Sequence, residues 1–192
     1  MILVTTGTNG VAFDRLLRAV DAIETEEPMV VQHGPSSLRP RRATCVDYVS
    51  FDELVELVRE ARLVVSHGGV GSILVALTNE KRPLVVPRLA RFGEVVDDHQ
   101  LELARKLAGV GLVTLGEDVG LLPQLVLSTN PRLIARNEAS STDLVVDLRG
   151  YLAATLGTLR PGLNGDGGSC PASPPSPGSA PEQGLAGRSV KP

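Results

Sequence analysis

The chain has 192 residues, a formal net charge of −3 and a hydrophobic content of 42%, enough for one domain with a substantial core and an appendage. Aromatic residues make up only 3%, so the core must be built from Val, Leu, Ile and Ala, as in α/β proteins with buried parallel strands. The negative charge and the lack of a dense Lys/Arg patch argue against a nucleic-acid-binding protein.

Short apolar runs alternate along the chain with apolar residues at helical spacing. In chain order they predict a strand at 2–5, a helix at 13–23, strands at 29–32 and 44–49, a helix at 51–61, a strand at 63–65, a helix at 70–77, a strand at 84–86, a loop at 88–97, a helix at 99–108, a strand at 111–114 and helices at 119–127 and 143–156. This alternation predicts an α/β fold, a parallel sheet with helices on both faces. Ligands in such folds bind at the carboxyl ends of the strands.

The composition changes after residue 160. Residues 161–192 are mostly Gly, Pro, Ser and Ala, with few large apolar side chains. Such a segment cannot bury enough surface to offset its ordering entropy. We therefore predict one domain over residues 1–160 and a disordered tail over residues 161–192.

Cysteine and hydropathy patterns bear on the compartment. Cys45 and Cys170 lie far apart, which disfavours a structural disulfide and favours a reducing, cytoplasmic location. No stretch approaches 18 consecutive apolar residues, and no basic segment with a long apolar run opens the sequence. We expect no membrane span and no signal peptide, so another protein would have to hold this chain at a membrane.

The segment from Ser66 to Ser72, Ser-His-Gly-Gly-Val-Gly-Ser, lies between a predicted buried strand and a helix. Its glycines, Gly69 and Gly71 among them, let the backbone approach a ligand closely. The free N–H groups and dipole at the start of the next helix suit a phosphate, and Ser72 and His67 add side-chain donors. A tight turn without a ligand is the alternative. His67 favours the binding site, because a buried histidine without a partner is costly.

A second polar segment ends the loop at 88–97. Asp97 can cap the next helix in a capping box with Gln100. Alternatively, His99 and Gln100 hydrogen-bond sugar hydroxyls, as polar side chains at the carboxyl end of a strand can do.

Small hydroxyl residues follow the first strand, around Gly7 and Thr8. They can line a second wall of the same cleft, although the sequence favours an ordinary loop. Asp14 and Arg15, on the helix that follows, are predicted to lie on a solvated face. The sequence offers no convincing pair of carboxylates for general acid–base catalysis and no metal-ligand cluster.

Several of these segments together resemble a known family. They are residues 5–8, 13–16, 66–72, 82–87 and 98–104. In this order and spacing they are similar to the C-terminal domain of family-28 glycosyltransferases. The small-subunit type is the best match; it includes PssE-like proteins of polysaccharide synthesis and the soluble subunit of the eukaryotic two-subunit UDP-GlcNAc transferase. The resemblance covers residues 1–127.

The resemblance implies one Rossmann-like half of a GT-B fold. In that family this half binds the UDP-sugar, and the other half binds the acceptor. In split systems the acceptor half is a separate, membrane-anchored protein, which is then expected to supply the general base. The implied location is peripheral, at the inner face of the membrane through that partner. The reaction commonly proceeds without a bound metal, and no cofactor is implied.

Site residues carry over one by one from the resemblance. His67, Gly71 and Ser72 match phosphate-contacting positions of the glycosyltransferase loop, to which Gly69 belongs. His99 and Gln100 match the sugar-contacting pair, and Val49 falls where the backbone meets uracil. Gly7 and Thr8 complete the expected donor site.

One residue departs from the family pattern. Related donor sites usually place an acidic residue three positions after the serine, to hold the ribose hydroxyls, and here that position is Val75. It lies about one helical turn beyond the glycine loop and is expected to face the site.

Two other functions are compatible with part of the sequence. A non-catalytic accessory subunit, which stabilises or enhances a catalytic partner, is favoured slightly by Val75. A nucleotide-sugar hydrolase or epimerase on a related fold is disfavoured, because those enzymes usually need both half-domains in one chain.

Overall fold

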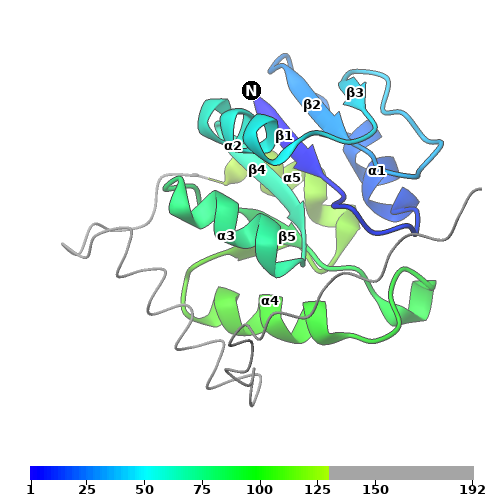
Figure 1. The fold of residues 1–192 in the computed structure, drawn as a ribbon, viewed down its shortest axis with the longest axis vertical. Coiled ribbons are helices and arrows are strands. Elements are labelled where there is room, and N and C mark those ends of the chain that lie inside the picture. The colour runs from blue at the N-terminus through cyan, green and yellow to red at the C-terminus, as the bar shows by residue number, and fades with distance from the viewer. Residues whose placement is uncertain (130–192) are drawn as a thin grey trace, which may run out of the picture.

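The computed structural model describes residues 1–129, in which six parallel strands form one sheet (Figure 1). The strands are β1 (Ile2–Thr5), β2 (Met29–Gln32), β3 (Thr44–Val46), β4 (Leu63–His67), β5 (Leu84–Val86) and β6 (Thr114–Leu115). Their order across the sheet is β3-β2-β1-β4-β5-β6, and every neighbouring pair is parallel. The chain order therefore reverses between β1 and β4, and such a switch point is where open α/β sheets bind ligands.

Helices cover both faces of this sheet, as the sequence predicted (Figure 1). They are α1 (Asp14–Asp21), α2 (Phe51–Glu60), α3 (Val70–Thr78), α4 (His99–Gly109) and α5 (Leu122–Ser128), with short 3-10 turns η1 (Ala90–Phe92) and η2 (Val119–Leu121). Helices α1 and α5 pack on one face, and α2, α3 and α4 contribute to the clusters on the other.

Burial explains the composition of the strands. All four residues of β1 are buried, and so are the first four of β4. Alternate residues of β1 serve opposite faces: Ile2 and Val4 pack with α1, whereas Leu3 packs with α2. A central strand covered on both sides needs an unbroken apolar run, which is the pattern that the sequence shows.

The boundaries differ from the sequence prediction at several places. Strand β3 ends at Val46 instead of residue 49, so Asp47 to Ser50 form a loop. Strand β4 extends through His67. The last described strand begins at Thr114, because Gly111 adopts a left-handed φ of 79° and belongs to the turn before it. The expected helix at 119–127 is divided into η2 and α5, with Pro123 in the first turn of α5.

Two expectations lie outside the described residues, namely the helix at 143–156 and the disordered tail at 161–192. The division at residue 160 therefore stays a prediction. Within residues 1–129, none of the helices is long and apolar enough to cross a membrane.

Candidate functional site

A cavity of about 230 Å³ opens at the switch point, at the carboxyl ends of β1, β2 and β4. It is lined by Thr5, Gly7, Thr8, Gln32, Tyr48, Val49, Leu54, His67, Gly71 and Ser72. Six of the nine predicted site residues thus lie around one cavity, although they come from three separate segments. Gly69, His99 and Gln100 are not among the lining residues.

One wall of the cavity is formed by the glycine loop and the first turn of α3. Gly69 is the N-cap residue, with extended backbone, and no side chain within residues 1–129 caps the helix. The N–H groups of the first turn have no carbonyl partner inside the helix. Gly71 and Ser72, in that turn, line the cavity. These N–H groups and the positive end of the helix dipole favour an anion there.

The ring of His67 is enclosed by two glycines. A Cβ added at Gly7 or at Gly69 would come within 3.0 Å of His67 ring atoms. Gly7 also has a left-handed φ of 78°, which side chains other than glycine rarely adopt. The two glycines therefore make room for the imidazole at the floor of the cavity.

Burial and the nearby positive charge of Arg88 lower the pKa of His67 to about 4. The imidazole is therefore neutral at pH 7, with one N–H donor. Its Nδ1 is buried and has no hydrogen-bond partner within residues 1–129. The other ring nitrogen, Nε2, lies between Gly7 and Gly69 and is the one placed to donate toward the cavity when it carries the proton.

The low pKa of His67 makes the stability of the domain depend on pH. An unfolded histidine titrates near 6.5, so between about pH 6.5 and pH 4 the unfolded chain binds the extra proton and the folded chain does not. The stability that the neutral His67 contributes is complete above pH 6.5 and is lost as the pH falls to 4. We expect a loss on the order of 3 kcal/mol in the free energy of unfolding. Urea unfolding across this range should show it, and His67→Gln should remove that part of the slope.

Gln32, which the sequence reasoning missed, holds Gly7 in place. Its Oε1 accepts hydrogen bonds from the Gly7 N–H at 3.1 Å and from the Thr5 hydroxyl at 2.8 Å. Its Nε2 donates to the Gly7 carbonyl at 3.1 Å and to the Asp47 carbonyl at 3.0 Å. The side chain is buried and fully bonded, so it lines the cavity without a free donor and holds the backbone of Gly7 in place.

The loop after β3 forms the third wall. Its Asp47 carboxylate lies 2.7 Å from Nε2 of the buried His33, and the loop leads through Tyr48 and Val49 to α2. That helix starts in a capping box, in which the Ser50 hydroxyl accepts from the Glu53 N–H and the Glu53 carboxylate accepts from the Ser50 N–H. These contacts fix where Val49 meets the cavity.

The segment at the start of α4 differs from the predicted capping box. The N-cap residue is Asp98, and Asp97 accepts from the His99 N–H instead. The Gln100 carboxamide turns toward β5 and accepts from the Arg88 N–H at 3.3 Å. Gln100 nevertheless lies against the glycine loop, since a Cβ added at Gly68 would come within 2.8 Å of the Cβ of Gln100. His99 is 72% exposed and paired with Asp97.

Comparison with known proteins identifies the family. Residues 1–141 match the model of the glycosyltransferase family 28 C-terminal domain. The chain belongs to this family. Among solved structures it is similar to MurG of Acinetobacter baumannii, with a TM-score of 0.50 and 22% identity over 78% of this chain and 49% of MurG. The family 28 domain described here is thus one Rossmann-like half of a GT-B fold, as the resemblance implied.

Two curated relatives carry the same name. The UDP-N-acetylglucosamine transferase subunit ALG13 of Yarrowia lipolytica is 32% identical over 122 residues, which are 56% of this chain and 60% of that protein. The human UDP-N-acetylglucosamine transferase subunit ALG13 is 32% identical over 119 residues, which are 55% of this chain and 10% of that protein. The family 28 domain therefore spans less than two thirds of either relative.

Val75 does not line the cavity in this family 28 domain. It is partly buried and packs against the apolar cluster between α2, α3 and the sheet, beside Val58 and Ala76. Leu54 of α2 packs in the same cluster and does line the cavity, so residue 75 lies near the site without lining it. In the described part of the chain, no carboxylate lines the cavity.

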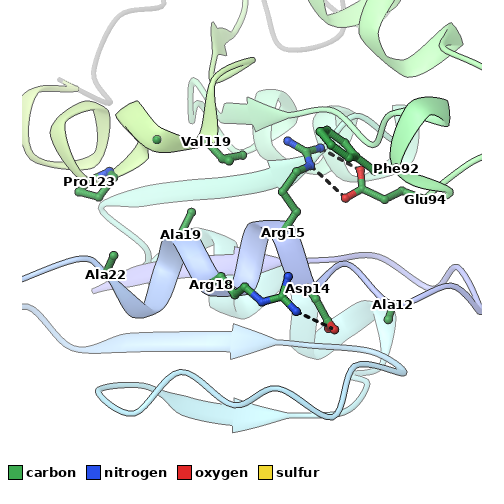
Figure 2. Close-up of a pocket in the computed structure, with 11 residues that line it drawn as sticks. Ala12, Asp14, Arg15, Arg18, Ala19, Ala22, Phe92, Glu94, Val119 and Pro123 are labelled. Atoms are coloured by element: carbon green, nitrogen blue, oxygen red, sulfur yellow. Dashed lines mark hydrogen bonds and ion pairs between the residues drawn. The ribbon is translucent and has the colours of Figure 1, made fainter.

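A larger cavity, of about 680 Å³, lies along α1 and η2 in the family 28 domain (Figure 2). Its two arginines are paired: Arg15 with Glu94 at 2.9 Å and Arg18 with Asp14 at 3.9 Å. The paired charges leave no excess positive charge for a phosphate. Arg15 is only 14% exposed, so the predicted solvated face is wrong for this residue, which reaches off α1 to the carboxylate of Glu94.

Proposed function

We propose that this family 28 domain is the donor-binding subunit of a glycosyltransferase. It would transfer a hexose or N-acetylhexosamine from a UDP-sugar to a lipid-linked or polysaccharide acceptor. The observation that carries the proposal is the meeting of Gly7, His67 and the uncapped start of α3 around one cavity. The relatives named as subunits of a UDP-N-acetylglucosamine transferase support the choice of a UDP-sugar.

The proposed roles follow the three walls of the cavity. The first-turn N–H groups at Gly71 and Ser72, with the Nε2–H of His67, bind the diphosphate, and the loop of Gly7 and Thr8 closes over it. The backbone at Val49 meets the uracil. His99 and Gln100, at the start of α4, reach the sugar beyond the glycine loop.

Catalysis in this proposal is electrostatic. Transfer breaks the bond between the sugar and the diphosphate, so negative charge grows on the departing UDP. A neutral His67 donor and the start of α3 are in place before the reaction to stabilise that charge. No residue of this chain is proposed as the general base.

A partner chain is part of the proposal. The cavity of about 230 Å³ is smaller than the roughly 300–1,000 Å³ typical of small-molecule sites. We propose that a membrane-anchored acceptor-half subunit completes it, supplies the general base and holds this chain at the cytoplasmic face of the membrane.

Reconstitution tests this function. The purified chain should transfer no sugar alone, whereas the chain with its membrane-bound partner should transfer from one of several UDP-sugars. Radiolabelled donors and extracted lipid acceptors provide the readout. Robust transfer by the chain alone would contradict the need for a partner.

An accessory subunit is the second candidate. The absence of a lining carboxylate in the described part of the chain favours it, because the ribose hydroxyls then lack their usual acceptor. In that case the partner would transfer sugar, slowly, without this chain, and the chain would not bind UDP.

A further inference from the structure

Arg88 is a buried cation that the proposed chemistry does not use. Its side chain follows β5 and is 0% exposed. The guanidinium donates to the carbonyls of Thr6 at 3.0 Å and Val11 at 2.9 Å, and more weakly to Ala12 at 3.4 Å. It also stacks on the Phe13 ring, with 4.6 Å between the guanidinium carbon and the ring centre.

All these partners lie between β1 and α1. That segment carries Gly7 and Thr8 and has no regular secondary structure in its middle. Carbonyl groups in such a segment need donors from elsewhere when they are buried. The planar guanidinium meets the requirement from one side chain, because its N–H groups diverge toward Thr6 and Val11.

The segment after β5 is held by a second set of contacts. The Glu94 carboxylate is nearly buried, accepts from the Leu89 N–H at 3.0 Å and pairs with Arg15 of α1 (Figure 2). Arg15 also donates to the Pro87 carbonyl, next to Arg88, at 2.7 Å. The backbone at Arg88 is therefore held in place, and the hydrogen bonds of its guanidinium hold the loop after β1 at a fixed position relative to β5.

We propose that Arg88 is a positioning residue of the donor site, which keeps the loop from Thr6 to Ala12 in the shape that places Gly7 and Thr8 beside His67. This inference rests on the proposed donor-binding function. Arg88 touches no part of the cavity itself and acts through the backbone of the loop.

A second effect of Arg88 follows from its charge. Its positive charge adds to burial in lowering the pKa of His67. The same residue that shapes the loop therefore helps to keep the imidazole neutral.

Arg88→Lys tests the proposal. An ammonium keeps the charge and much of the stem, but it cannot reach Thr6 and Val11 together. We expect a folded protein whose affinity for UDP falls by about tenfold or more, equivalent to at least one net hydrogen bond. The amide resonances of Gly7 and Thr8 should shift in the unliganded protein. Arg82→Lys is the matched control, because Arg82 donates to the Val113 carbonyl at the other end of β5.

The outcomes separate the two claims. If the wild-type chain does not bind UDP, the proposed function fails, and the inference fails with it. If the wild type binds and Arg88→Lys binds equally well with unchanged Gly7 and Thr8 resonances, only the inference is overturned. A lower melting temperature with unchanged affinity, measured well below unfolding, would make Arg88 merely structural. If Arg88→Lys does not fold, Arg88→Gln with the same readouts decides.

Discussion

Gly7→Ala should strongly weaken UDP binding and destabilise the domain. The new Cβ would meet the His67 ring within 3.0 Å, at a backbone φ of 78°. The left-handed conformation and the overpacking together cost on the order of 3 kcal/mol. The ring and the loop must also move apart, so we expect affinity to fall about 100-fold or more. Calorimetric titration with UDP and thermal unfolding measure the two effects.

Gly10→Ala is the control in the same loop. A Cβ there meets nothing within 4 Å among the described residues, and the backbone φ is not in the left-handed range. It should leave both stability and affinity close to those of the wild type. Equal behaviour of the two variants would show that the enclosure of His67 by Gly7 does not exist in solution.

His67→Ala should weaken UDP binding roughly 10- to 100-fold, because a hydrogen bond to a charged group contributes about 1.5–3 kcal/mol. The neutral ring already carries an N–H donor and needs no proton from solution. The loss should therefore be the same at pH 7 and pH 8. Calorimetry at both pH values measures it.

His99→Ala provides the contrast. His99 is exposed and is proposed to contact the sugar, so UDP without a sugar should bind this variant as it binds the wild type.

For His67→Ala, unchanged affinity together with a large loss of stability would contradict the binding role and make His67 a core residue.

The fold was predictable because its signals are local. The buried runs of β1, β4 and β5 and the helical spacing of α1 and α2 can be read from neighbouring residues. The predicted ends of strands and helices differ from the structure where a backbone conformation sets them, as at Gly111, whose left-handed φ delays the start of β6. The domain limit at residue 160 and the tail stay predictions.

The site was predictable in part. The glycine loop has a local signature, and the switch point of a parallel sheet brings Gly7 to His67. Gln32 and Arg88 carry no such signature. Their roles depend on hydrogen bonds to residues far away in the sequence, which neighbouring residues do not reveal. Val75 packs in the cluster of Leu54 instead of lining the cavity, a contact with α2 that spacing along α3 alone does not determine.

The measurement that tests the central claim most directly is a UDP titration of the ¹⁵N-labelled chain, followed by amide chemical shifts. Saturable shifts should appear at Gly7, Thr8, Gly71 and Ser72, and not at Ala19 and Gly120, which line the larger cavity. Unchanged spectra in millimolar UDP, or shifts confined to the larger cavity, would contradict the assignment of this domain as the donor-binding half.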